Sequence, residues 1–256
     1  MQCRYKEKII EAGDMIFGAV YATYRKPGKR RGKWKPTSET QEKLNDRHAR
    51  ERLTWTVHAN FTKKDYVITL TYAEGCYPES EERFEKDTRN YIDRLRRIYK
   101  KAGKELKYIV IKAFGENGRC HLHIIVSGGV DREVVENAWE YGRRNTRRLQ
   151  FNACGIVDLS RYLSDQRHAG RRRWSGSKNL VKPVERTNLT RYSRKALKEI
   201  AESANPHKIF SDRYPGYWLS EFPEVSKNGF NGSYYMTFVM YKPDSDNLER
   251  YARRRS

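Results

Sequence analysis

The chain has 256 residues and a formal net charge of +21, from 53 lysine and arginine residues against 32 aspartate and glutamate residues. This length suits one large domain or two small ones, and a pI near 9.8 favours a polyanionic partner, above all nucleic acid, with a membrane surface as the alternative. No apolar run approaches the roughly 18 residues of a membrane-spanning helix, and the opening MQCRYKEKIIEAG lacks the apolar core of a signal peptide. We therefore expect a cytoplasmic protein without a membrane partner.

The N-terminal part predicts a β-hairpin followed by a basic loop. Residues 15–24, MIFGAVYATY, are rich in β-branched and aromatic residues and predict a strand, with residues 3–10 as its candidate hairpin partner. The next segment, 25–36, reads RKPGKRRGKWKP and predicts an exposed loop. It is either a solvated linker or a flexible arm that binds a phosphate backbone. The candidate nucleic-acid contacts in this loop are Arg30, Arg31, Lys33 and Trp34.

The middle and end of the chain alternate helical and extended patterns. Ser38 and Gln41 form a capping box, so we expect a helix from there to about Ala59. Further helices are predicted over 80–103, 131–142, 156–166 and 190–203, and strands over 66–72, 106–114, 120–128, 148–154 and 234–243. The last of these strands is similar to the strand at 15–24, and we expect the two to lie in one sheet.

Two histidines, His121 and His123, alternate along the strand predicted at 120–128 and therefore share one face. The preceding Asn117-Gly118 pair predicts a two-residue hairpin turn. Counting outward from this turn pairs Glu116 with Arg119, Phe114 with His121, and Lys112 with His123. Glu116 then becomes the diagonal neighbour of His121. Two imidazoles and a carboxylate on one patch predict a metal site with open coordination positions, although two hydrogen-bonded histidines would also satisfy the pattern.

Tyr162, on the helix predicted at 156–166, is a candidate covalent nucleophile because a phenol oxygen can attack phosphorus. Asp158 and Asp165 flank it at helical spacing. The alternative is an ordinary core-facing tyrosine.

A second basic segment, RHAGRRRWSGSKNLVKP over 167–183, follows the predicted helix. Its candidate nucleic-acid contacts are Arg171, Arg172, Arg173, Trp174 and Lys178. Arginines pair with phosphates, and an embedded tryptophan can stack on bases. None of the four cysteines forms a CxxC pair, so the sequence predicts neither a zinc knuckle nor a redox motif.

Three ordered segments, VITLTY, HLHIIV and RYLSDQ, resemble the rolling-circle replication initiators of phages and plasmids. These are the Rep proteins of the His-hydrophobe-His (HUH) endonuclease superfamily, and this chain is similar to their single-tyrosine class. The resemblance covers about residues 36–183. NLxKP after RRRW, and the segment over 36–61, resemble a phage-associated branch.

The resemblance implies an α+β fold, with an antiparallel sheet of about five strands and packed helices, related to ferredoxin-like folds. It implies an HUH endonuclease domain over 1–186, with 187–256 as a C-terminal helix and strand of unassigned role that could pack on the same domain. It also implies nicking and religation of single-stranded origin DNA through a 5′-phosphotyrosine intermediate. Tyr162 would be the nucleophile, and His121, His123 and Glu116 would hold Mg²⁺ or Mn²⁺.

Two departures from the family pattern refine these expectations. The family usually has a lysine three residues after the tyrosine, where this chain has Asp165. Arg161, Arg167 or Arg171 could steer the phosphate instead, and Asp158 or Asp165 could approach the metal. Nothing matches GxxxxGK[ST], so no helicase domain is expected, and a host helicase and polymerase are implied as partners.

Alternative functions stay open from the sequence. Within the superfamily they are a single-tyrosine transposase and, with a poorer fit to the histidine motif, a relaxase. Outside it they are a metal-dependent nuclease that uses water and a non-catalytic RNA- or DNA-binding module with an RRM-like sheet. Aromatic residues on the exposed sheet face would favour the module. The strand in question carries histidines there instead.

Overall fold

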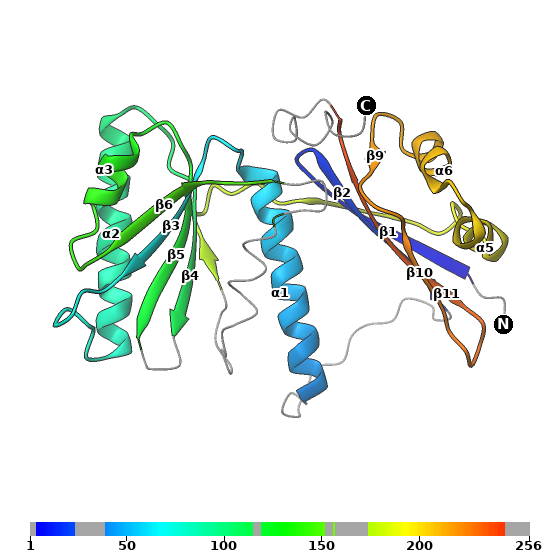
Figure 1. Cartoon of the computed structure of the whole chain (residues 1–256), viewed down its shortest axis with the longest axis horizontal. Helices are drawn as coiled ribbons and strands as arrows, with labels where there is room; N and C mark the ends of the chain where they lie inside the picture. Colours follow the sequence, from blue (N-terminus) through cyan, green and yellow to red (C-terminus); the bar gives the residue numbers. More distant parts are fainter. Residues whose placement is uncertain (1–3, 24–38, 115–118, 152–155, 157–173, 244–256) are drawn as a thin grey trace. The chain divides into compact units, whose positions relative to one another are not determined.

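A computed structural model describes residues 4–23, 39–114, 119–151, 156 and 174–243 (Figure 1). The chain divides into two compact units. Unit 1 comprises Met1–Ala59, Asn152–Gly155 and Lys182–Ser256, and unit 2 comprises Asn60–Phe151 and Ile156–Val181. Each unit contains an antiparallel sheet with helices, so the predicted α+β class is confirmed. None of the described helices is long and apolar enough to cross a bilayer.

Unit 2 is built on a five-stranded sheet in the order β6-β3-β5-β4-β7. Its strands are β3 (Tyr66–Thr71), β4 (Tyr108–Phe114), β5 (Cys120–Val126), β6 (Arg144–Arg148) and β7 (Ser175–Gly176), and its helices are α2 (Glu81–Lys101) and α3 (Arg132–Asn137). Every neighbouring pair in this sheet is antiparallel. The strand β5, which carries both histidines, therefore lies at the centre of the sheet.

Helix α2 forms where capping and amphipathic pattern agree. The Ser80 side chain accepts a hydrogen bond from the Arg83 backbone N–H at 3.2 Å, which satisfies a donor that the first turn leaves free. The apolar stripe of α2 packs with the alternate residues Leu122, Ile124 and Val126 of β5 in one buried core. The predicted burial of this face of β5 is thus confirmed, and its opposite face carries the histidines.

Unit 1 is built on a six-stranded sheet in which β10-β11-β2-β1-β8 follow one another and β9 pairs with β11. The strands are β1 (Arg4–Ala12), β2 (Met15–Thr23), β8 (Val184–Asn188), β9 (Trp218–Leu219), β10 (Glu224–Lys227) and β11 (Tyr234–Tyr241), and the helices are α1 (Glu39–Asn60), α5 (Arg194–Glu202) and α6 (Pro206–Arg213). The predicted hairpin of β1 and β2 is confirmed, as is the expectation that 15–24 and 234–243 share a sheet.

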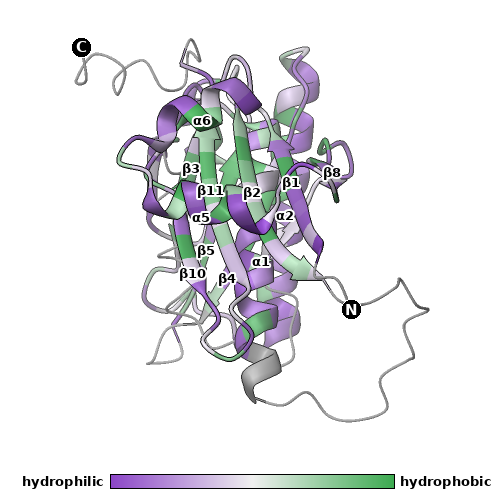
Figure 2. Cartoon of the chain, turned by 90° about the vertical axis from the view of Figure 1, so that its right-hand side faces the viewer, coloured by the Kyte–Doolittle hydropathy of each residue, from purple (hydrophilic) through white to green (hydrophobic). Residues whose placement is uncertain are grey.

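One face of this sheet packs against α5 and α6 in a second hydrophobic core. Figure 2 shows much of β2 and β11 in the hydrophobic colour. Gly18 of β2 allows a close contact in this core, because a Cβ there would lie 2.0 Å from the Phe238 ring. The missing side chain at Gly18 thus makes room for an aromatic ring from the neighbouring strand.

Two predicted elements close to β3 have the wrong bounds. The strand predicted over 148–154 is instead β6, which ends at Arg148, because the polar run RNTRR pairs with β3 as an edge strand. The helix predicted over 131–142 ends at Asn137. The chain after it runs beside β3 instead, where Ala73 N–H donates to the Tyr141 carbonyl at 2.8 Å. The helix predicted over 156–166 lies, apart from Ile156, outside the described residues.

The compact units do not follow the division expected at residue 186. That position lies inside β8, which pairs with β1, and β11 pairs with β2. The N-terminal hairpin and the C-terminal strands therefore form one sheet, held by backbone hydrogen bonds between segments far apart in sequence.

Candidate functional site

The two histidines lie next to each other on the same face of β5. The ring centroids of His121 and His123 are 4.9 Å apart, and the ring planes are nearly perpendicular at 87°. Their cross-strand neighbours on β4 are Ala113 and Ile111, respectively. The imidazoles therefore stand side by side above small and aliphatic residues in the middle of the sheet.

The register of β4 and β5 differs by one residue from the register predicted by a two-residue turn. Ala113 pairs with His121 and Ile111 with His123, so Lys112 and Phe114 lie on the opposite face. Our placement of Glu116 on the histidine face depended on the incorrect register, and Glu116 itself lies outside the described residues.

His123 is held by a threonine on the adjacent strand. Thr69 of β3 is its cross-strand partner, and the Thr69 Oγ1 lies 3.1 Å from the His123 Nδ1. When the Nδ1–H donates a hydrogen bond to this hydroxyl, Nε2 keeps its lone pair. A contact of this kind orients a ligating imidazole and fixes its tautomer.

Burial keeps both imidazoles neutral. Desolvation and, to a smaller extent, the nearby His121 together lower the pKa of His123 to about 4. Desolvation also lowers the pKa of His121, although a hydrogen bond with the Arg119 backbone opposes the shift. A neutral imidazole is the form that binds a divalent cation, so the chemistry of this pair fits a metal site.

The histidine face is less open than expected. His123 is only 5% exposed, whereas His121 is half-buried. Within the part of the chain that the structure describes, no third histidine, cysteine or carboxylate joins the pair. The described part of the site thus consists of two imidazoles, with His121 as the more accessible one.

A polar strip continues from the histidines to the edge of the sheet. Thr69 pairs with Asn145, and Val67 pairs with Arg147, so both β6 side chains point to the histidine face, and both are exposed. On the other face of β6, Arg144 donates to the Trp139 carbonyl at 3.0 Å. Arg147 thus presents a cation beside the histidine face of the same sheet.

The sequence pattern alone did not indicate these threonine, asparagine and arginine positions. The alternation of YVITLT signals that Thr69 and Thr71 share a face, but only the strand order places that face beside the histidines. Asn145 and Arg147 were missed because β6 was predicted several residues too late.

The second basic segment is described only from Trp174 onward. Trp174 is half-buried and directly precedes β7, which pairs with β4, and Lys178 is exposed just after β7. Both therefore belong to the same unit as the histidines. The remaining predicted site residues lie outside the described residues: Tyr162, Glu116, Asp158, Arg161, Asp165, Arg171, Arg172, Arg173, Arg30, Arg31, Lys33 and Trp34.

Comparison with known families gives one match. The family model of the ORF2-type replication-associated protein matches residues 65–167, a segment that runs from the start of β3 past β6 and contains both histidines. Residues 65–167 are therefore similar to Rep-type replication-associated proteins. The match takes in less than half of the 256 residues and supports a role in replication initiation. No curated protein and no solved structure matched the chain.

Proposed function

We propose that this Rep-type chain nicks and religates single-stranded DNA at an origin and thereby starts rolling-circle replication. The observation that carries the proposal is the pair of neutral imidazoles, His121 and His123, at the centre of the sheet within the family-matched segment. Two adjacent imidazoles with depressed pKa values suit cation binding better than they suit proton transfer near neutral pH.

His121 and His123 would hold a divalent cation, Mg²⁺ or Mn²⁺, and the family resemblance implies Glu116 as a third ligand. Imidazole nitrogen favours softer ions than magnesium, which makes manganese the better match to this ligand set. When bound, the cation would polarise the scissile phosphate and stabilise charge in the transition state. Thr69 would keep the His123 ring in the ligating orientation.

Tyr162 would supply the nucleophile. Its phenol oxygen would lose its proton and form a bond to the scissile phosphorus, while the bond from phosphorus to the 3′ oxygen breaks and that oxygen takes up a proton. The products would be a 5′-phosphotyrosine and a free 3′-OH that can prime synthesis. Attack by a 3′-OH would reverse the step without a nucleotide cofactor, because the phosphotyrosine retains the phosphodiester energy.

Exposed cations on the same unit would position the strand. Arg147 and Lys178 are exposed on the unit that carries the histidines. Arg171, Arg172, Arg173 and Trp174 precede Lys178 and would add phosphate and base contacts. Arg161, Asp158 and Asp165 are the further candidates near the nucleophile. In the cytoplasm, a host helicase would unwind the duplex and a host polymerase would extend the primed end.

Substitution of the nucleophile tests the proposal. Tyr162→Phe removes only the phenol oxygen, so we expect DNA binding to persist while cleavage and rejoining of single-stranded DNA with Mn²⁺ disappear. The assay would use a pool of single-stranded fragments from the source genome and wild-type protein as the reference. Cleavage by Tyr162→Phe at the wild-type rate would refute the tyrosine mechanism and favour a nuclease that uses water.

A further inference from the structure

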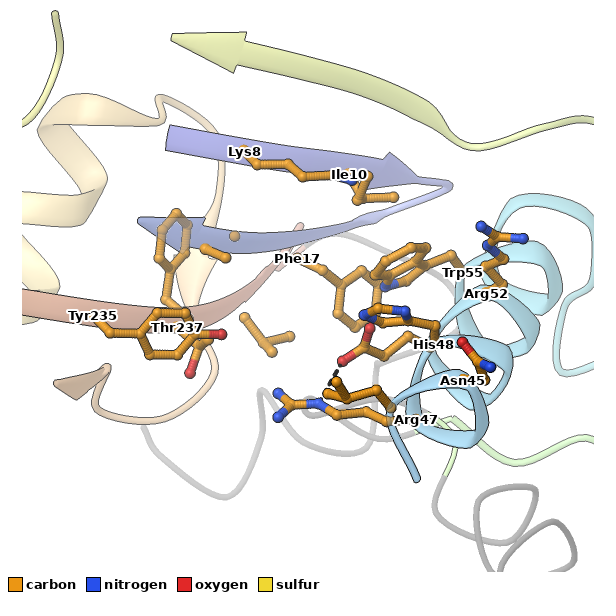
Figure 3. Close-up of a pocket in the computed structure, with 16 residues that line it drawn as sticks. Lys8, Ile10, Phe17, Asn45, Arg47, His48, Arg52, Trp55, Tyr235 and Thr237 are labelled. Carbon is orange, nitrogen blue, oxygen red and sulfur yellow. Dashed lines mark hydrogen bonds and ion pairs between the residues drawn. The ribbon is translucent and has the colours of Figure 1, made fainter. Parts of the chain in front are cut away.

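A groove in unit 1 combines aromatic and basic side chains on residues that the replication-associated match does not reach. It lies between α1 and the face of the six-stranded sheet that points away from α5 and α6. The cavity measures about 780 Å³. Figure 3 shows side chains from β1, β2, β11 and α1 lining it together. The aromatic members include Phe17, Trp55 and Tyr235, and the basic members include Lys8, Arg47 and Arg52.

The alternation of the strands builds one wall of the groove. Lys8 of β1 pairs with Ala19 of β2, which pairs with Thr237 of β11, so all three side chains share this face. The next alternate positions on β2 and β11 add Phe17 and Tyr235 to the same face. The opposite face carries the core that packs on α5 and α6.

Helix α1 forms the other wall and is fixed at its C-terminal end. Phe17 lies 6.3 Å from Trp55 and 5.6 Å from His58, measured between ring centroids. Gly13, in the turn between β1 and β2, has φ +58°, and a Cβ there would lie 2.3 Å from the His58 carbonyl oxygen. This close approach joins the hairpin turn to the end of α1.

The aromatic groups of the groove are available to a ligand. Tyr235 is 42% exposed, and Phe17 and Trp55 are half-buried. Such groups stack on unpaired bases, whose faces are accessible in a single strand and covered in a duplex. The groove chemistry therefore favours a single-stranded nucleic acid over a double-stranded one.

The charge of the groove is complementary to phosphate. Glu51 is the one acidic lining residue among those described, against Lys8, Arg47 and Arg52. Glu51 pairs with Arg47 at 2.9 Å, and Lys8 pairs with Glu185 at 3.0 Å. Arg52 is exposed and has no carboxylate partner among the described residues, so its cation is available to a phosphate.

We propose that this groove is a second binding site for single-stranded DNA, distinct from the histidine face of unit 2. Bases would stack on Tyr235 and Trp55, while Arg52 and Lys8 would contact the backbone. The choice of DNA over RNA rests on the proposed nicking function. The groove would hold a stretch of the origin strand and so add affinity without taking part in the chemistry.

The test measures the binding of fluorescent oligothymidine to the full chain without divalent metal, so that cleavage does not contribute. Tyr235→Ala removes a stacking ring, and we expect binding to weaken about tenfold. Arg52→Ala should lower the magnitude of the log-affinity against log-salt slope by about 0.7, the effect of removing one phosphate contact on a single strand. Phe230→Ala and Lys195→Ala serve as controls, because Phe230 is 99% exposed and Lys195 is exposed, and neither lines the groove.

The outcomes separate this proposal from the nicking proposal. Selective weakening by Tyr235→Ala and Arg52→Ala supports the groove even if the protein fails to cleave DNA. Wild-type affinity in both variants, or equal losses in the controls, would overturn it even if cleavage is intact. Tighter binding of oligouridine that depends on the same two residues would overturn the assignment to DNA. Circular dichroism of each variant would verify that the fold is retained.

Discussion

At the residue scale, the contact between Thr69 and His123 is expected to orient the imidazole. Its hydroxyl lies 3.1 Å from the His123 Nδ1, and valine would keep the branched shape while removing this contact. We expect Thr69→Val to weaken Mn²⁺ binding by about 10- to 100-fold, because outer contacts to a ligating imidazole typically contribute that much. Calorimetric titration of the metal-free protein measures the effect.

The control is Thr71→Val, on the same strand and face. Thr71 pairs with His121, and its hydroxyl lies 3.4 Å from a backbone carbonyl rather than from an imidazole. Its replacement should leave Mn²⁺ affinity close to wild type. Equal affinity in wild type, Thr69→Val and Thr71→Val would contradict a positioning role for Thr69.

His58 should make the stability of unit 1 depend on pH. Burial lowers its folded-state pKa to about 4, below the ordinary value of 6.5, so the unfolded chain binds the extra proton between these values. Stability is therefore complete above about pH 6.5 and decreases as pH falls through 4, by about 3 kcal/mol. Urea unfolding at several pH values should show a shallower loss for His58→Gln, and identical pH dependence of the two proteins would contradict this assignment.

The alternation of His121 and His123 was sufficient to place them on one face, and the structure confirms that they are neighbours. The contact with Thr69 could not be predicted, because it depends on which strand lies beside β5 and in which register. Side-chain alternation gives the face of a residue, whereas a contact across strands requires the pairing itself.

At the scale of elements, α2 illustrates what local sequence can determine. Its Ser80 cap, acidic first turn, apolar stripe and basic last turn all indicate the same helix, and the observed bounds differ little from those predicted. The turn before β5 illustrates the opposite case. Asn117-Gly118 predicted a two-residue turn, yet the strands pair with a register one residue away. A short-range signal was overridden by the packing of two strands that are both buried.

Because α2 packs on the core beneath β5, we expect a buried and an exposed substitution to change the free energy of unfolding by very different amounts. Leu95 of α2 is fully buried in the same core as Leu122, so Leu95→Ala should destabilise unit 2 by about 2–5 kcal/mol. Val134 of α3 is 44% exposed, and Val134→Ala should change stability by less than about 0.5 kcal/mol. Hydrogen exchange of the β3 and β5 amides reports on unit 2 alone, and similar exchange in both variants would disagree with the observed core.

At the scale of the whole molecule, the sequence indicated an α+β fold but not its division into units. The strand β2 pairs with β11 more than two hundred residues later in the chain, although the segments are adjacent in the sheet. Similar composition of the two strands suggested this pairing. The pairing of β8 with β1 had no such signal, because the exposed VERTN segment lacks an apolar pattern.

The chain has a net charge of +21, and we expect some of its basic residues to contact phosphates directly while others attract DNA without a specific contact. Neutralising Arg171, Arg172 and Arg173 together should lower the magnitude of the salt slope for oligothymidine by about 0.7 for each phosphate that an arginine no longer binds. Binding titrations at several salt concentrations measure this slope. An unchanged slope would show that the three arginines form a solvated run without phosphate contacts.

We propose that a tyrosine of this chain becomes covalently attached to DNA. The most direct measurement incubates the protein with single-stranded origin DNA and Mn²⁺, digests the SDS-resistant adduct and locates the nucleotide by mass spectrometry. We predict a 5′-phosphate linked to the Tyr162 peptide, with no adduct in Tyr162→Phe and a strongly reduced yield in His121→Ala. Cleaved DNA with a free 5′-phosphate and no adduct would contradict covalent catalysis by Tyr162.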